Sequence, residues 1–217
     1  MKTDDCRRNF TISIPKETLN SLPAAEYQGE IHVIDQPEQV ENAILRLRSS
    51  DVVGFDTETR PSFKKGQTHQ VSLIQLATRS ECFLFRLNHL GLPTPLLDYI
   101  EDEHQLKIGL SIHDDFHNLQ RLHPGLSPAG FIDLQDFVKK WKITDTSLTK
   151  IHAILFGKRI SKSQRLTNWE AETLSPHQQS YASLDALACI NIYDYLHNGE
   201  FSPAKSNFKN FPENNTP

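Results

Sequence analysis

The sequence predicts a mixed α/β fold in which helices cover one central sheet, followed by a C-terminal half that is mainly helical. Short apolar runs of strand character alternate with amphipathic segments as far as Asp133. Two of these runs are separated only by a polar turn, which is typical of an antiparallel hairpin, whereas the others flank helical segments. Beyond Asp133 helical patterns dominate. Strands interleaved with helices in this way indicate a mixed sheet.

The body of the domain opens with a strand and an amphipathic helix. Residues 31–34 read as a short strand, and Pro37 suits the first turn of a helix. The apolar positions of this helix recur at helical spacing, at Val40, Ala43, Ile44 and Leu47. The next strand, residues 52–55, is apolar and runs directly into Asp56.

The hairpin comes next. Residues 71–77 and 82–85 are apolar and flank a Thr-Arg-Ser-Glu turn, so they predict two antiparallel strands. A helix is expected after Pro93 or Pro95.

Two further strands are predicted at residues 106–110 and 130–133. Between them, Asp114 or Asp115 is expected to cap a helix that runs to about Leu122.

The length indicates one domain with loose ends. A chain of 217 residues with 37% hydrophobic content can bury one full core but falls short of two typical domains. Residues 1–29 and 198–217 are polar with scattered apolar positions, so we expect a loose N-terminal extension and a polar C-terminal tail. The domain itself is then residues 30–197.

Charge and cysteine content exclude several classes. With 23 basic and 27 acidic residues the chain is no polycation, so any contact with nucleic acid has to come from a local patch. Cys6, Cys82 and Cys189 lie far apart without a CxxC pair, which argues against a disulfide framework or a thiolate zinc site. We expect Cys189 to pack as a small hydrophobe. The N-terminus has no apolar h-region and no membrane-length apolar run occurs, so we expect a soluble cytoplasmic protein.

Asp56 and Glu58 are the first candidate site residues. They lie two apart at the end of a strand, so both side chains point to one face, roughly 7 Å apart along the backbone. A polar strand end with a capping Asp56 and a solvated Glu58 would give the same spacing. A carboxylate inside an apolar strand is nevertheless destabilising unless something neutralises it, and divalent cations held by oxygen ligands do so.

Tyr181 and Asp185 are the second candidate pair. They lie four apart in a helix for which Ser175 is a fair N-cap and Pro176 suits the first turn, so they stack on one face. Asp185 sits in a strongly apolar run, where an unpartnered carboxylate would be unfavourable. Asp115 is the fourth candidate acid, although Asp114 beside it leaves this position uncertain by one residue. Four carboxylates would balance two Mg²⁺ or Mn²⁺ ions, which hard oxygen ligands favour over zinc.

Three ordered motifs carry a resemblance to a known family. FDTE, GLSIHDD and YASLDA, with the flanking QVSLIQLAT and KSQRLTNWEAETLSPHQQS, resemble the motifs of the DEDDy group of 3′–5′ exonucleases, which contains ribonuclease D and the Werner syndrome exonuclease domain. The likeness covers about residues 30–197. It implies a ribonuclease H-like fold and an enzyme that degrades DNA or RNA from a single-stranded or frayed 3′ end, releasing nucleoside 5′-monophosphates by a two-metal mechanism.

The resemblance also implies roles for the residues. Asp56, Glu58 and Asp185 would bind one divalent metal. Asp56 would also bind the second, which Asp115 would reach directly or through water, and Tyr181 would position the attacking water. The histidine variant of the family would place a histidine at position 180, which is Ser180 here, so the tyrosine subclass is favoured. His113 receives no role.

Basic residues near the motifs are candidates for phosphate contacts. They lie after the first motif and in the segment GKRISKSQR, as Arg60, Lys64, Lys158, Arg159, Lys162 and Arg165. Such runs are also typical of solvated loops. Phe63 or Trp169 could stack a terminal base, although Trp169 is expected in the core.

Two other functions stay open. His113 and Asp114, with His117 four residues on, could mark a histidine/aspartate metal phosphohydrolase, although that class is mainly helical. A catalytically silent nucleic-acid-binding module of the same fold is the second. The presence of all four acids and the tyrosine argues against it.

Overall fold

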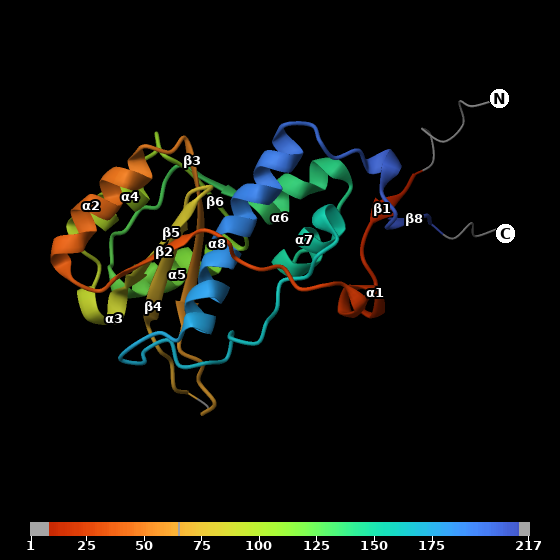
Figure 1. The fold of residues 1–217 in the computed structure, drawn as a ribbon. Coiled ribbons are helices and arrows are strands. Elements are labelled where there is room, and N and C mark those ends of the chain that lie inside the picture. The colour runs from red at the N-terminus through yellow and green to blue at the C-terminus, as the bar shows by residue number, and fades with distance from the viewer. Residues whose placement is uncertain (1–8, 65, 213–217) are drawn as a thin grey trace, which may run out of the picture.

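A six-stranded mixed sheet lies at the centre of the computed structural model, which describes residues 9–64 and 66–212 (Figure 1). In the order in which they lie, its strands are β2 (Glu30–Ile34), β5 (Glu81–Arg86), β4 (Val71–Ala77), β3 (Val52–Thr59), β6 (Leu106–Gly109) and β7 (Phe131–Asp133). Strand β4 is antiparallel to both of its neighbours, and the other adjacent pairs are parallel. The predicted mixed sheet and its hairpin are therefore confirmed.

Helices cover both faces of this sheet (Figure 1). On one face pack α2 (Pro37–Arg48), α4 (Thr94–Glu101) and α5 (Ile112–Leu122). The long α8 (Pro176–His197) crosses the other face. The remaining helices of the domain are α3 (Leu87–Leu90), α6 (Leu134–Phe137), the 3₁₀ helix η2 (Val138–Trp141) and α7 (Leu148–Phe156). All four apolar positions predicted for α2 are buried, and the helical C-terminal half is confirmed.

The central strand β3 is shared between the two cores. Val53 and Phe55 pack with α2, α4 and α5, and successive side chains on a strand point to opposite faces. Gly54, Asp56 and Glu58 therefore face α8. At Gly54 an added Cβ would lie 1.8 Å from the carbonyl oxygen of Ala186. The missing side chain is what allows the backbone of α8 to rest directly on the strand.

The start of α8 is fixed by local sequence. Ser175 accepts a hydrogen bond from the backbone N–H of Gln178, whose side chain accepts one from the backbone N–H of Ser175. The amide group of Gln178 also donates to Thr167 and to the carbonyl of Asn168, which ties the preceding loop to the helix. The predicted N-cap is thus confirmed, and it sets the position of Tyr181 and Asp185 along α8.

The described parts of both termini pack on the helical half, so the expectation of loose ends is wrong for these residues. Strand β1 (Thr11–Ile12) pairs with β8 (Lys209–Asn210). The short helix α1 (Lys16–Ser21) follows β1, and the short 3₁₀ helix η3 (Pro203–Lys205) precedes β8. Ile12 and Ile14 are buried, and the backbone N–H of Ile14 donates to Asp145. The pairing joins residues at opposite ends of the chain, which a local pattern cannot reveal.

The cysteines behave as expected where they are described. Cys82 and Cys189 are buried and free, and Cys189 packs in the apolar core beneath α8. Cys6 lies outside the described residues. Within the described ranges no helix combines the length and the apolar character that crossing a bilayer requires.

Candidate active site

Asp56 and Glu58 lie at the C-terminal end of β3, on the face covered by α8. Asp56 is half-buried, and Glu58 is only 8% exposed. Their shared orientation follows from the two-residue repeat of the strand, as predicted. One oxygen of Asp56 accepts a hydrogen bond from the backbone N–H of Thr57.

Tyr181 and Asp185 approach from α8. They lie one helical turn apart, with Asp185 buried at 6% exposure and Tyr181 half-buried. The ring of Tyr181 lies 6.1 Å from that of Trp169, which is fully buried. Trp169 is therefore a core residue that supports the tyrosine, and its suggested role in base stacking is not supported.

Asp115 approaches from α5, the helix on the opposite face of the sheet. Its carboxylate accepts a hydrogen bond from the hydroxyl of Thr57 on β3, whereas Asp114 points to solvent. The structure thus places Asp115, and not its neighbour, beside the acids of β3. The site forms where helices from both faces meet the end of one strand.

The cap of α5 differs from the prediction. The helix begins after Ser111, which has a left-handed backbone with φ 61°, and neither Asp114 nor Asp115 caps it. Instead the carboxylate of Asp133, at the end of β7, accepts hydrogen bonds from the backbone N–H groups of Ser111 and Ile112. A carboxylate at the positive end of the helix orients its first turn, and with it Asp115.

The acids are close enough to perturb one another. Burial, and then the negative charges of Asp115, Asp185 and Glu58, raises the pKa of Asp56 well above its usual range. Burial and the charges of Asp185 and Asp115 raise the pKa of Glu58 to about 9. Burial likewise raises the pKa of Asp115 and of Asp185. Buried like charges of this kind are typical of sites that bind cations or transfer protons.

A cleft of about 310 Å³ opens beside these acids. Its lining includes Asp56, Tyr181 and Asp185, the first residues of α7, and two basic residues, Lys162 and Arg165. The positive charge of Lys162 lowers the pKa of Asp185, and that of Arg165 lowers the pKa of Glu58, each against the larger effect of burial. The volume is at the lower end of the range for small-ligand pockets.

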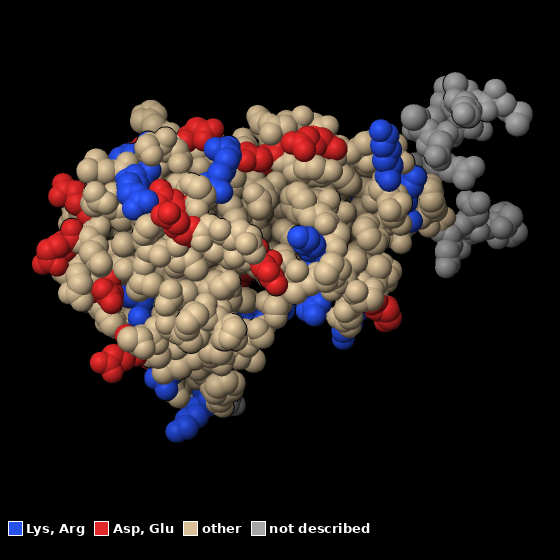
Figure 2. Space-filling view, viewed as in Figure 1, with Lys and Arg blue, Asp and Glu red and all other residues tan. Residues whose placement is uncertain are grey.

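The other predicted basic contacts lie elsewhere. Arg60 pairs with Glu170 at 3.0 Å, and Arg159 donates to the backbone carbonyl of Leu22 at 3.1 Å, where it holds the N-terminal segment. Lys64 and Lys158 are exposed and do not line the cleft. Figure 2 shows acidic and basic side chains interspersed over the visible face of the molecule, with basic groups also at the lower end of the view.

Phe63 is 81% exposed, so base stacking by this residue stays a prediction. His113 and His117, on which the phosphohydrolase alternative rests, are both exposed on α5.

The four acids, Asp56, Glu58, Asp115 and Asp185, fit hard divalent cations. All four offer carboxylate oxygens, the ligands that Mg²⁺ and Mn²⁺ prefer, and their burial favours neutralisation by a cation. Among the described residues, no three of them bring their oxygens within 4.8 Å of one another. Bound cations would therefore have to draw the four side chains together.

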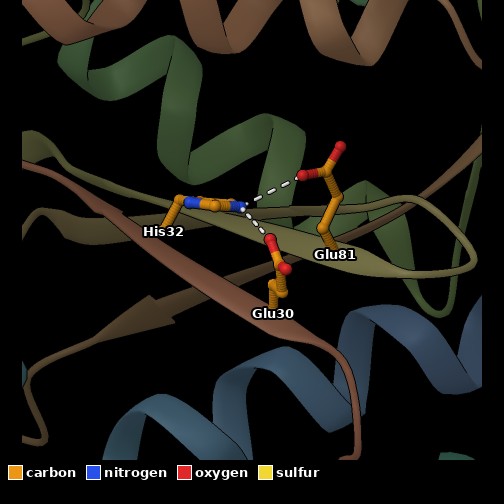
Figure 3. A group of neighbouring side chains, drawn as sticks. All are labelled: Glu30, His32 and Glu81. Atoms are coloured by element: carbon orange, nitrogen blue, oxygen red, sulfur yellow. Dashed lines mark hydrogen bonds and ion pairs between the residues drawn. The ribbon is translucent and has the colours of Figure 1, made fainter.

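A second cluster, Glu30, His32 and Glu81, does reach that spacing (Figure 3). The guanidinium of Arg46 donates to Glu81 and lies 3.2 Å from Nε2 of His32. Arg46 thus already supplies the positive charge that a bound cation would otherwise provide. We therefore interpret the cluster as an ion-pair group that joins β2, β5 and α2.

Sequence reasoning did not identify Thr57 and Asp133 as supporting residues. Thr57 lies between the two acids of the first motif, and this position could have indicated that it supports the site. Asp133 lies at the end of β7, which is two places from β3 in the sheet. Nothing in its local sequence links it to the start of α5.

Comparison with known proteins gives a consistent result. The profile of a family described as 3′–5′ exonuclease matches residues 31–199. The mouse bifunctional 3′–5′ exonuclease/ATP-dependent helicase WRN is 32% identical over 209 residues, which cover 91% of this chain and 15% of that protein. A 3′–5′ exonuclease of Arabidopsis thaliana is 35% identical over 160 residues, 66% of this chain and 52% of that protein. The chain therefore spans about half or less of the length of these relatives.

Among solved structures, the crystal structure of the Nibbler EXO domain of Aedes aegypti matches with a TM-score of 0.71 at 23% identity. The match covers 83% of this chain and 96% of that one. At this identity the likeness concerns the fold.

Proposed function

Because the chain belongs to the 3′–5′ exonuclease family, we propose that it hydrolyses phosphodiester bonds from the 3′ end of DNA or RNA and releases nucleoside 5′-monophosphates. The family match and the likeness to the Nibbler domain confirm the resemblance and the ribonuclease H-like fold predicted from the sequence. The substrate, the metals and the mechanism are part of the proposal, as is cytoplasmic localisation.

One observation carries the proposal: Asp56 from β3 and Asp185 from α8 line a single cleft together with Tyr181, and Asp115 from α5 lies beside β3, where it accepts a hydrogen bond from Thr57. Asp56, Glu58 and Asp185 would hold one Mg²⁺ or Mn²⁺ ion, and Asp56 with Asp115 the second. Such a pair of ions lowers the pKa of a bound water and stabilises charge on the leaving oxygen. These are the requirements for hydrolysing a phosphodiester at neutral pH.

The protein groups around the acids have complementary tasks. Burial, and then the charge of Asp185, raises the pKa of Tyr181, so its phenol stays protonated well above neutral pH and can orient the attacking water. Lys162 and Arg165, on the wall of the cleft, would bind phosphates of the strand and hold its 3′ end against the acids.

The proposal is tested by digestion of 5′-labelled single-stranded DNA and RNA with Mn²⁺. The labelled strand is expected to shorten stepwise from its 3′ end, and no shortening is expected when EDTA is present from the start. The rates of digestion of DNA and of RNA, measured at equal concentration, show which of the two is the preferred substrate. Binding without cleavage would instead support the silent-module alternative.

Replacing Tyr181 with phenylalanine is expected to lower kcat by about 10²-fold while Mn²⁺ binding is kept, because a misplaced water slows the reaction without removing a metal ligand. Single-turnover kinetics at saturating Mn²⁺ measure this. Tyr193→Phe, on the same helix but packed against Phe137, is the matched control and should match the wild type. An unchanged kcat in Tyr181→Phe would exclude the tyrosine from the reaction.

Replacing Lys162 and Arg165 together with glutamine is expected to weaken substrate binding and to reduce its salt dependence by about 0.7 in the log–log slope for each phosphate that is no longer bound. Affinity for a single-stranded oligonucleotide is measured across a salt series with Ca²⁺ in place of Mn²⁺. The double variant Lys64→Gln/Lys158→Gln removes the same charge outside the cleft and serves as the control. Equal slopes in the two double variants would show that Lys162 and Arg165 do not bind the strand.

A further inference from the structure

Gln75, on β4, has a buried side-chain amide that forms no hydrogen bond with the described residues. The residue is 0% exposed, and neither its Oε1 nor its Nε2 has a hydrogen-bond partner among the described residues. A buried amide that stays unpaired is destabilising, and an apolar residue of the same shape would avoid the penalty. Gln105, which is also buried, does have a partner, because its amide donates to the carbonyl of Ser50. The unpaired state of Gln75 therefore calls for a functional explanation.

The register of the sheet places this amide next to the acids. Gln75 pairs directly with Asp56 across β3 and β4. Side chains of directly paired antiparallel residues point to the same face, with Cβ atoms about 4.5–5.5 Å apart. Leu73 and Ala77, two residues to either side of Gln75, pack in the core beneath α8. Gln75 thus lies under the helix that carries Asp185, in the same layer as Asp56.

The chemistry of the two groups is complementary. The primary amide offers two N–H donors, and a carboxylate offers about four acceptor positions. The backbone N–H of Thr57 uses one position on Asp56, which leaves others for a cation and for a second donor. Carboxylates that bind metals are usually held in place by such outer hydrogen bonds, and removing one lowers metal affinity.

We propose that Gln75 is a positioning residue for the cation site, and that its amide donates to the carboxylate of Asp56 when a divalent cation is bound. The inference rests on the proposed function, because it assumes that Asp56 is a metal ligand. Gln75 contacts neither the cation nor the substrate in this role. Its effect is to hold one ligand in the orientation that the cation needs.

Gln75→Met tests the proposal, since methionine matches the length of glutamine and is apolar. Free Mn²⁺ is followed by electron paramagnetic resonance during titration of the protein, and melting temperatures are recorded without metal. A positioning role predicts a Kd for Mn²⁺ that rises about 10- to 100-fold, together with a metal-free melting temperature equal to or above that of the wild type. Gln105→Met, at the opposite end of β3, should lower the melting temperature and leave the Kd unchanged.

The results distinguish a failure of the proposed function from a failure of the role of Gln75. Wild-type protein that binds no Mn²⁺ at millimolar concentration would contradict the proposed function itself. Wild-type binding that Gln75→Met reproduces with the same Kd would overturn only the role of Gln75. If Gln75→Met does not fold, Gln75→Leu carries the same expectation and is measured in the same way.

Discussion

Replacing Asp56 with asparagine is expected to lower the rate of hydrolysis by about 10³-fold or more, because this side chain is the one proposed to serve both cations. Asparagine keeps the size of the residue but removes the charge that binds them. Stepwise digestion of a labelled strand at saturating Mn²⁺ measures the decrease. Asp114→Asn, which removes an exposed acid near the site, is the matched control and should digest at the wild-type rate.

The same substitution is expected to make the metal-free protein less sensitive to pH. Burial, and then neighbouring charges, raises the pKa of Asp56 and brings that of Glu58 to about 9, so the folded chain keeps protons that the unfolded chain releases above about pH 4. Stability from these groups is therefore full in acid and is lost as the pH rises toward 9. With one of these acids removed, the melting temperature should fall less between about pH 5 and pH 9 than in the wild type. Identical pH profiles would contradict a shared site.

Replacing Gly54 with alanine is expected to destabilise the protein by about 3 kcal/mol or more, at the upper end of overpacking penalties. The new Cβ would lie 1.8 Å from the carbonyl oxygen of Ala186, and a backbone atom cannot turn aside as a side chain can. For a domain of this size the melting temperature should fall by about 10 °C. Because α8 would have to move, Mn²⁺ binding should weaken as well.

Gly157→Ala is the control for this substitution. Gly157 has a φ of 65°, and a Cβ there would meet nothing within 4 Å, so its replacement strains only the backbone. The expected penalty is about 1–2 kcal/mol, the cost of a left-handed backbone in a residue that carries a Cβ. A Gly54→Ala protein that melts within a degree or two of the wild type would show that α8 does not rest on β3 as described.

Local patterns predicted the elements that local physics determines. The buried positions of α2 follow from helical spacing, and the start of α8 follows from Ser175 and Pro176. The orientation of Asp56 and Glu58 follows from the alternation of a strand. In each case the residues that decide the outcome lie within a few positions of one another.

Contacts between distant segments were not predictable in this way. Asp133, from another strand, caps the helix that carries Asp115. Arg159 donates a hydrogen bond to the carbonyl of Leu22 near the N-terminus. A basic run in the sequence has the same appearance whether its side chains face a cleft, as Lys162 does, or an internal carbonyl. The choice between Asp114 and Asp115 likewise required the position of Thr57.

Counting bound Mn²⁺ in variants of acids from different elements shows whether these acids form one metal centre. Titration followed by electron paramagnetic resonance should give about two ions per wild-type chain, as a two-metal site requires. Asp115→Asn on α5 and Asp185→Asn on α8 should each weaken binding or remove an ion, whereas Asp114→Asn should bind as the wild type does. Mn²⁺ binding that is unchanged when both Asp115 and Asp185 are replaced would contradict the convergence of these helices on one metal centre.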